Sequence, residues 1–301
     1  MFGGVCKTRY LCKKVDINTD EFQPSVGQHL MTNHKLIAID LDGTLVRSDQ
    51  SISQRTIDTL IHVQEMGVKL AIASGRPTYG TAHVADTLRL QDFGGYVMSY
   101  NGGEIYDWQT KQRLHAQTLD KKLIPYLYSY AQTQGLPIMT YIGKEVVSEE
   151  EGNRYIQYSS IRNRMSIKKV DNFVEAVQEE EIVKCIIVGD PDVLPPLEAE
   201  LQSTLKGRAG AFRSEPFFLE IVPQGIDKGK GLSILLNKLG MKREDLLAFG
   251  DGYNDIPMLQ FAGTGVAMDN AAEAIKKAAD EVAPSNNDDG IAIYLENEMK
   301  G

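Results

Sequence analysis

The ten-residue segment LIAIDLDGTL, residues 36–45, limits the possible fold more than any other part of the chain. Its first four residues are all apolar, and because side chains of a strand point alternately to the two faces of a sheet, both faces must be buried. Such strands lie inside parallel sheets, whose ligands bind beyond the carboxyl ends of the strands. The segment therefore predicts a parallel α/β sheet that delivers Asp40 and Asp42 to a ligand site. Taken alone, the two aspartates also fit a solvated turn.

A buried strand followed by a polar loop occurs twice more. The apolar run 68–73 ends in the tetrapeptide SGRP, and the run 246–249 ends in GDGYND, residues 250–255. Between them, DKGKG at 227–231 precedes leucines whose spacing gives one apolar stripe on a helix. The stripe explains the leucines but not the lysines, so Lys228 and Lys230 are candidates for a chemical role.

In this order, DLDGT, the SGR serine, the DKGKG lysine and GDGYND resemble the four signature motifs of the haloacid dehalogenase superfamily of phosphohydrolases. Asn101-Gly102-Gly103, after a predicted strand at 96–99, and GVAMDNA at 265–271 resemble its Cof-type branch. Family members often carry alanine where this chain has Gly103. The resemblance extends from residue 35 to the last residue. It implies a Rossmann-like, doubly wound parallel sheet core with an inserted α/β cap domain of the type-two class.

The length of 301 residues predicts two compact units. We expect residues 34–103 and 217–301 to form the catalytic core and residues 104–216 to form the cap, with hinges near Asn101-Gly102-Gly103 and Gly225. The expected cap elements are helices at 121–133, 153–158, 173–178 and 193–205, and strands at 137–141, 183–188 and 217–222. Residues 1–33 lack periodicity and are expected to be an extension, either disordered or artificial, so that the functional chain would begin at Met31.

The residue types suit phosphoryl transfer, which needs a nucleophile, cations and a proton shuttle. Asp40 is the expected nucleophile, forming an aspartyl-phosphate, and Asp42 is the expected general acid and base. The family pattern selects Lys228 as the functional lysine, because it stands just before the first glycine, and leaves Lys230 facing solvent. Ser74 is the matching hydroxyl that binds phosphate. The predicted catalytic residues are therefore Asp40, Asp42, Ser74 and Lys228.

Counting charges favours a metal ion at this site. The motifs bring together four negative charges, on Asp40, Asp42, Asp251 and Asp255, against one positive charge on Lys228. The resulting net negative charge would repel an anionic substrate. A divalent cation corrects the balance, and oxygen ligands favour Mg²⁺. The resemblance implies that the carboxylates of Asp40 and Asp251 and the main-chain carbonyl of Asp42 bind the metal, with Asp255 close to it or holding a metal-bound water. Asp255 also suits a helix N-terminus.

Predicted substrate contacts lie mostly in the same loops: Thr44, Gly43, Gly75, Arg76, Asn101, Gly102 and Asn254. Thr44 either orients its loop, binds the phosphoryl group or caps a helix. Arg76 either contacts substrate or pairs with an acidic neighbour. Asn254 either orients Lys228, touches substrate or serves only its loop. The cap offers five candidate substrate contacts: Tyr141, Asn153, Tyr155, Arg162 and Arg164. The alternative is that they are ordinary surface or packing residues of the cap.

The composition argues against some classes of binding partner and of enzyme. A net charge of −9 argues against nucleic acid and membrane surfaces, and no apolar run reaches the roughly 20 residues that span a bilayer. Three scattered cysteines favour reduced thiols in a cytoplasmic protein. All five histidines lie in the first part of the chain, which disfavours a histidine phosphatase or a Ser-His-Asp hydrolase.

These features together predict a Mg²⁺-dependent phosphatase for small phosphorylated metabolites, either sugar phosphates or phosphorylated cofactors. One alternative is a phosphomutase of the same superfamily, in which a second sugar hydroxyl accepts the phosphoryl group. Another is a regulator that binds a phospholigand without turnover. No pattern in the chain identifies the physiological substrate or the oligomeric state.

Overall fold

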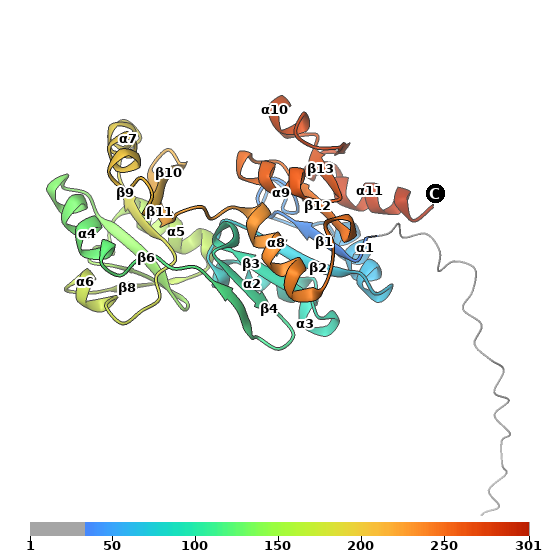
Figure 1. Ribbon diagram of the computed structural model, residues 1–301, viewed down its shortest axis with the longest axis horizontal. Helices are drawn as coiled ribbons and strands as arrows, with labels where there is room; N and C mark the ends of the chain where they lie inside the picture. The colour runs from blue at the N-terminus through green and yellow to red at the C-terminus, as the bar shows by residue number, and fades with distance from the viewer. Residues whose placement is uncertain (1–33, 301) are drawn as a thin grey trace, which may run out of the picture.

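The computed structural model describes residues 34–300, which form two separate β-sheets joined by two crossings of the chain (Figure 1). The larger one, here called the core sheet, has the strand order β14-β13-β12-β1-β2-β3-β4-β5. The smaller one, called the second sheet, has the order β10-β11-β9-β6-β7-β8. The predicted extension at residues 1–33, with the expected start at Met31, lies outside the described residues.

The centre of the core sheet is the strand predicted from LIAIDLDGTL. This strand, β1 (Leu36–Ile39), pairs in parallel with β2 (Lys69–Ala73) and β12 (Leu246–Gly250). Parallel pairing continues outward through β3 (Tyr96–Ser99), β13 (Thr264–Met268) and β14 (Glu281–Ala283). All four side chains of β1 are at most 1% exposed. The predicted parallel α/β core is therefore confirmed.

Helices cover both faces of the core sheet, as a doubly wound fold requires. Ile37 and Ile39 pack with the helices α1 (Gln54–Glu65), α2 (Thr78–Thr87) and α11 (Gly290–Glu298). Leu36 and Ala38 point the other way and pack with α8 (Lys228–Leu239), α9 (Ile256–Phe261) and α10 (Glu273–Lys276). The short α3 (Leu90–Phe93) precedes β3. The leucine stripe of residues 232–239 thus contacts the sheet, as its spacing predicts.

The second sheet has one face covered by several helices and one face that turns toward the core sheet. Its strands are β6 (Ile138–Ile142), β7 (Glu145–Ser148), β8 (Ser166–Lys169), β9 (Cys185–Val188), β10 (Ala209–Glu215) and β11 (Phe218–Pro223). The covering helices are α4 (Leu123–Thr133), α6 (Phe173–Ala176) and α7 (Leu194–Thr204). On the other face lies α5 (Arg154–Asn163), which contacts α2 of the core layer (Figure 1).

Strand pairing moves the expected boundaries at residues 104 and 216. The strands β4 (Glu104–Asp107) and β5 (Arg113–Ala116) extend the core sheet as an antiparallel hairpin on β3, whereas β11 pairs with β9 in the second sheet. The hairpin belongs to the core because its backbone completes the open edge of β3. A hinge at Asn101-Gly102-Gly103 is therefore wrong, because the first crossing follows β5. Gly225 does follow β11 at the second crossing. The role of the second sheet as a cap stays a prediction.

Within residues 34–300, no helix is long and apolar enough to cross a bilayer.

Close packing of α9 on β13 leaves no room for a side chain at Gly265, where an added Cβ would lie 2.2 Å from the carbonyl oxygen of Leu259. We expect Gly265→Ala to lower the free energy of unfolding by about 1–3 kcal/mol, because the backbone must shift. Gly152→Ala is the matched control, since an added Cβ there meets nothing within 4 Å and should change stability by less than about 0.5 kcal/mol. Urea unfolding measures both variants, and equal stabilities would contradict the packing.

Candidate active site

The predicted site residues gather at one edge of the core sheet. Asp40 follows β1, Ser74 follows β2, Asp251 follows β12, and Lys228 is the first residue of α8. Because neighbouring parallel strands end at the same edge, their loops meet there. The four motifs, although far apart in the sequence, therefore form one site.

Lys228 is the buried centre of this site. Its side chain is 0% exposed, and Nζ lies 2.5 Å from Oδ1 of both Asp40 and Asp255. Burial disfavours the charge of Lys228, but Asp255 and Asp40 outweigh burial and raise its pKa. Burial, followed by the charge of Asp255, raises the pKa of Asp40. One buried ammonium group thus balances two buried carboxylates that would otherwise repel each other.

Three acidic side chains at this edge fit a divalent metal ion. Carboxylate oxygens of Asp40, Asp251 and Asp255 lie within 4.8 Å of one another. Burial raises the pKa of Asp251 to about 6, although a hydrogen bond from Thr44 opposes the shift. With Lys228 as counter-charge, three ionised carboxylates still leave an excess of negative charge, and the donors are all oxygen atoms of the kind that hard cations prefer.

Asp255 also holds its own loop together. Its Oδ2 accepts hydrogen bonds from the backbone N–H groups of Asp251 at 3.0 Å and Gly252 at 2.8 Å. Both N–H groups come just before the short helix η3 (Tyr253–Asp255), which Asp255 ends. The side chain of Asp255 makes no capping hydrogen bond to α9. Asp255 therefore orders the GDGYND loop and contacts Lys228 at the same time.

Thr44 and Gly43 position Asp251. Thr44 Oγ1 donates to Asp251 Oδ1 at 2.7 Å. Gly43 has a φ of +85°, and an added Cβ would lie 2.2 Å from Asp251 Oδ2, so only glycine fits this turn. The alternative in which Thr44 caps a helix is wrong, because the next helix, α1, begins at Gln54 and is capped by Ser53. Asn270 was not among the predicted site residues, yet its Nδ2 donates to the carbonyl oxygen of Gly43 at 2.8 Å.

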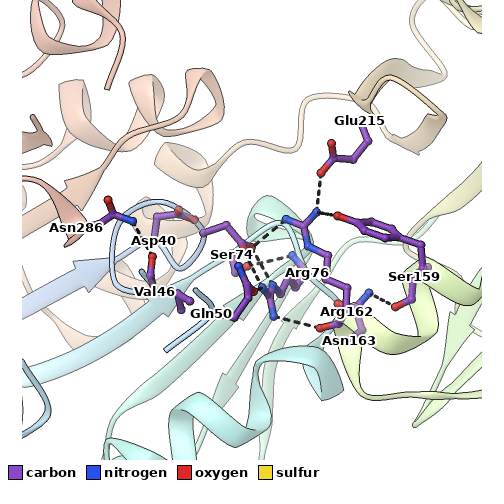
Figure 2. Close-up of polar contacts among 12 residues, drawn as sticks. Asp40, Val46, Gln50, Ser74, Arg76, Ser159, Arg162, Asn163, Glu215 and Asn286 are labelled. Carbon is purple, nitrogen blue, oxygen red and sulfur yellow. Dashed lines mark hydrogen bonds and ion pairs between the residues drawn. The ribbon is translucent and has the colours of Figure 1, made fainter. Parts of the chain in front are cut away.

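Two arginines hold the Asp42 carboxylate. Arg76 donates to it through Nε at 2.8 Å and Nη2 at 2.5 Å, and Arg162 Nη2 lies 3.4 Å away. Arg76 follows β2 and Arg162 belongs to α5, so the two guanidinium groups come from different layers (Figure 2). Burial alone would raise the pKa of Asp42, but the hydrogen bonds and charge of Arg76, helped by Arg162, lower it. Of the alternatives for Arg76, pairing with an acidic neighbour is the one seen.

The remaining loop residues mainly organise the backbone. Ser74 Oγ accepts from the N–H of Arg76 at 3.1 Å. Asn254 Nδ2 donates to Asn101 Oδ1 at 3.0 Å and makes no described contact with Lys228. Gly102, in η1 (Tyr100–Gly102), has a φ of +99°, and an added Cβ would lie 2.9 Å from the carbonyl oxygen just before Lys228. Gly75 would place a Cβ 3.2 Å from Asn101 Oδ1. The side chain of Lys230 is 66% exposed, as expected.

A cavity of about 470 Å³ separates these loops from the second sheet. The core layer contributes Asp40, Asp42, Gly75, Arg76, Asn101 and Asn254, among others. The second sheet and α5 contribute Tyr141, Arg162, Asn163, Lys184, Ser214, Glu215 and Glu220, with Phe212 and Phe218. Charged groups from both layers therefore face the same space beside Asp40.

Only two of the five predicted cap contacts reach the cavity, namely Tyr141 and Arg162. Asn153 instead caps α5 and Tyr155 donates to Asp190, so both serve the second sheet. Arg164 ends α5 in a left-handed conformation and does not line the cavity. Lys184 and Glu220 were missed, because single charged residues in or beside apolar strands form no motif. The signal available was a glutamate at the centre of FLEIV, residues 218–222.

Lys228→Met should expose the role of the buried ammonium group. It would leave Asp40 and Asp255 adjacent and unpaired, so we expect the free energy of unfolding in the presence of a chelator to fall by about 3–5 kcal/mol. Lys230→Met is the matched control and should cost less than about 0.5 kcal/mol, because the side chain of Lys230 is 66% exposed and its ion pair with Asp227 is a surface contact. Urea unfolding at neutral pH compares the two, and equal losses would show that Lys228 does not balance buried charge.

Similarity to known proteins agrees with the motifs and the fold. Residues 37–295 match the family described as haloacid dehalogenase-like hydrolase. A haloacid dehalogenase-like hydrolase from Bacteroides thetaiotaomicron is 48% identical with a TM-score of 0.85, over 88% of this chain and 99% of that one. TM0651 from Thermotoga maritima is 28% identical with a TM-score of 0.80, over 88% and 97% of the two chains.

A curated relative from Streptococcus pyogenes carries the name "Putative phosphatase" and is 29% identical over 264 residues, which are 86% of this chain and 96% of its own length. The four motifs of this chain lie at one edge of a doubly wound sheet, and both the family match and the relatives span nearly all of the described residues. The chain therefore belongs to the haloacid dehalogenase-like hydrolases and is a hydrolase of the phosphatase class.

Proposed function

We propose that the chain is a Mg²⁺-dependent phosphatase that hydrolyses small phosphomonoesters through an aspartyl-phosphate at Asp40. The observation that carries the proposal is the buried contact of Asp40 with Lys228 inside a carboxylate cluster that fits a divalent cation. Asp40 also lines the cavity between the two layers, so a phosphate ester in that cavity can reach it.

In the first step, a carboxylate oxygen of Asp40 attacks phosphorus as the ester P–O bond breaks. Asp42 gives its proton to the departing oxygen, which leaves as an alcohol. Ser74 and Lys228 donate hydrogen bonds to the phosphoryl oxygens, whose charge grows in the transition state. In the second step, water attacks the phosphorus of the aspartyl-phosphate, Asp42 takes the water's proton, and Asp40 is released.

The proton on Asp42 requires a rearrangement of its arginine partners. Arg76 and Arg162 hold Asp42 as a carboxylate, and they lower its pKa. An incoming phosphoryl group offers these guanidinium groups another anion. When Arg76 turns to that anion, the main cause of the low pKa is lost, so the pKa of Asp42 rises and the carboxyl group can carry the proton needed in the first step.

The carboxylates of Asp40 and Asp251 and the main-chain carbonyl of Asp42 would hold the metal, with Asp255 beside it. When bound, Mg²⁺ supplies positive charge that offsets the carboxylate cluster and stabilises charge on the phosphoryl oxygens. Thr44 keeps Asp251 oriented through its hydrogen bond, and Asn270 supports the same turn.

Mg²⁺ should stabilise the folded chain in the absence of any substrate. At 100 times its dissociation constant, a ligand that binds only the folded state adds about 2.7 kcal/mol to the free energy of unfolding. We expect a higher melting temperature with Mg²⁺ and little shift for Asp251→Asn. Asp269→Asn is the matched control, because that carboxylate is 65% exposed and pairs with Lys276. An unshifted melting temperature for the unmodified chain would argue against the metal site.

Asp40→Asn tests the nucleophile. Phosphate release from sugar phosphates, nucleotides and phosphorylated cofactors, measured with and without Mg²⁺, should fall by at least about 10⁴-fold, because an amide cannot form the covalent intermediate. Lys230→Ala should retain activity, since that side chain is 66% exposed and its contacts, with Gly225 and Asp227, lie outside the cavity. Activity of Asp40→Asn near that of the unmodified chain would exclude the proposed nucleophile.

The same assay separates the two alternatives. A phosphomutase would use the same aspartyl-phosphate but pass the phosphoryl group to a second sugar hydroxyl, so it would require a bisphosphate. Phosphate release without a bisphosphate favours the hydrolase. A phospholigand-binding regulator would bind phosphate esters without any Mg²⁺-dependent release.

A further inference from the structure

The second sheet presents a buried ion pair to the catalytic cavity. Lys184 precedes β9 and Glu220 lies in β11, with Nζ and Oε2 only 2.7 Å apart and side chains 3% and 7% exposed. We propose that Lys184 and Glu220 form a subsite that binds two adjacent hydroxyl groups of the substrate's leaving group. This inference rests on the proposed phosphatase function and specifies the substrate that the function takes.

Strand alternation places the pair on the cavity side of the second sheet. Cys185 and Ile187 of β9, like Leu219 and Ile221 of β11, pack into the core under α4 and α7. The alternate positions, Lys184 and Glu220, therefore point to the opposite face. That face carries α5 and lines the cavity beside Asp40.

Both charged groups keep unused hydrogen-bonding capacity. Lys184 Nζ donates to the carbonyl oxygen of Gly75 at 3.0 Å, and an ammonium group has three donors. Glu220 Oε1 accepts from Ser214 Oγ at 2.7 Å, and the ion pair with Lys184 Nζ, also at 2.7 Å, is the one described polar contact of its buried Oε2. A carboxylate accepts about four hydrogen bonds, so both partners can serve a bound ligand.

Stability alone gives little reason for this pair. Removing two charges from water is costly, and apolar residues of similar volume often serve a protein interior as well or better. On the same face of β9 as Lys184, the next two side chains, Ile186 and Val188, are apolar. A charged pair at this place, with spare donors and acceptors toward a cavity, therefore indicates recognition of a polar ligand.

The chemistry of the pair indicates the class of ligand. A hydroxyl group both donates and accepts, so one hydroxyl can donate to Glu220 while its neighbour accepts from Lys184. Because the two charges offset each other, the pair gives no preference for a second anionic group. Phe212 and Phe218 line the same cavity and suit the C–H face of a saturated ring. A neutral polyhydroxylated leaving group, such as a sugar, meets these features better than a flat aromatic ring.

Glu220→Gln is the sharper of the two possible variants. It keeps the size of the side chain and an acceptor for Ser214, whereas changing Lys184 would also remove the contact with Gly75 in the phosphate-binding loop. The matched control is Glu145→Gln, because Glu145 pairs with Lys168 at 3.7 Å on the same sheet and does not line the cavity.

The measurement is kcat/KM of the full chain for a hexose 6-phosphate divided by kcat/KM for p-nitrophenyl phosphate, whose leaving group has no neighbouring hydroxyls. We expect Glu220→Gln to lower this ratio about 10- to 100-fold, since buried polar groups lose a matched partner. Glu145→Gln should leave the ratio as it is. In the unmodified chain, deoxyhexose phosphates that each lack one hydroxyl should show a comparable loss for at least two adjacent positions.

The possible failures are distinguishable. An unchanged ratio in folded Glu220→Gln overturns the subsite, as does a deoxyhexose series that reacts like the parent sugar. Should Glu220→Gln not fold, the deoxyhexose series with the unmodified chain still decides. Hydrolysis of p-nitrophenyl phosphate without any hexose phosphate activity overturns the subsite and leaves the phosphatase function intact. Release from neither ester means that the proposed function has failed, and the subsite fails with it.

Discussion

The contact of one buried ammonium group with two buried carboxylates is the interaction on which the rest of the site depends. Lys228 can meet Asp40 and Asp255 only if α8 begins where β1 and β12 end. Gly102 packs closely against the start of α8, and Asp255 accepts hydrogen bonds from the N–H groups of its own loop. Both contacts help to hold α8 and the loop after β12 beside Asp40. The core sheet is therefore the frame that brings Asp40, the Lys228 ammonium group and the acidic cluster to one edge.

Burying charged groups at this edge is costly. Burial first, and the charges of neighbouring carboxylates second, raise the pKa of Asp40 and Asp251, and Lys228 offsets these shifts only in part. A bound divalent cation would remove most of this cost, so stability and metal binding are linked.

Two contacts join the second sheet to the loops of the candidate site, from Lys184 to Gly75 and from Arg162 to Asp42. Any displacement of the second sheet therefore changes the partners of groups that we place in the reaction.

Local patterns were sufficient to predict the parallel core and the loops that form the site. Continuous apolar runs identified β1, β2 and β12, and the family pattern, which places the functional lysine just before the first glycine, distinguished buried Lys228 from exposed Lys230. Contacts between residues far apart in the sequence could not be predicted from such patterns. Nothing near Arg76 in the sequence indicates that it binds Asp42, and the hairpin of β4 and β5 joins the core only because β3 leaves an open edge. The ion pair of Lys184 and Glu220 can be recognised only once β9 and β11 are known to be neighbouring strands.

Rapid acid quenching of the enzyme during turnover of a phosphate ester with Mg²⁺, followed by peptide mass spectrometry, tests the proposed nucleophile directly. We expect a phosphoryl group on the peptide that contains Asp40, and none on that peptide in Asp40→Asn. A phosphoryl group on a different residue, or turnover during which no peptide carries one, would show that Asp40 is not the nucleophile.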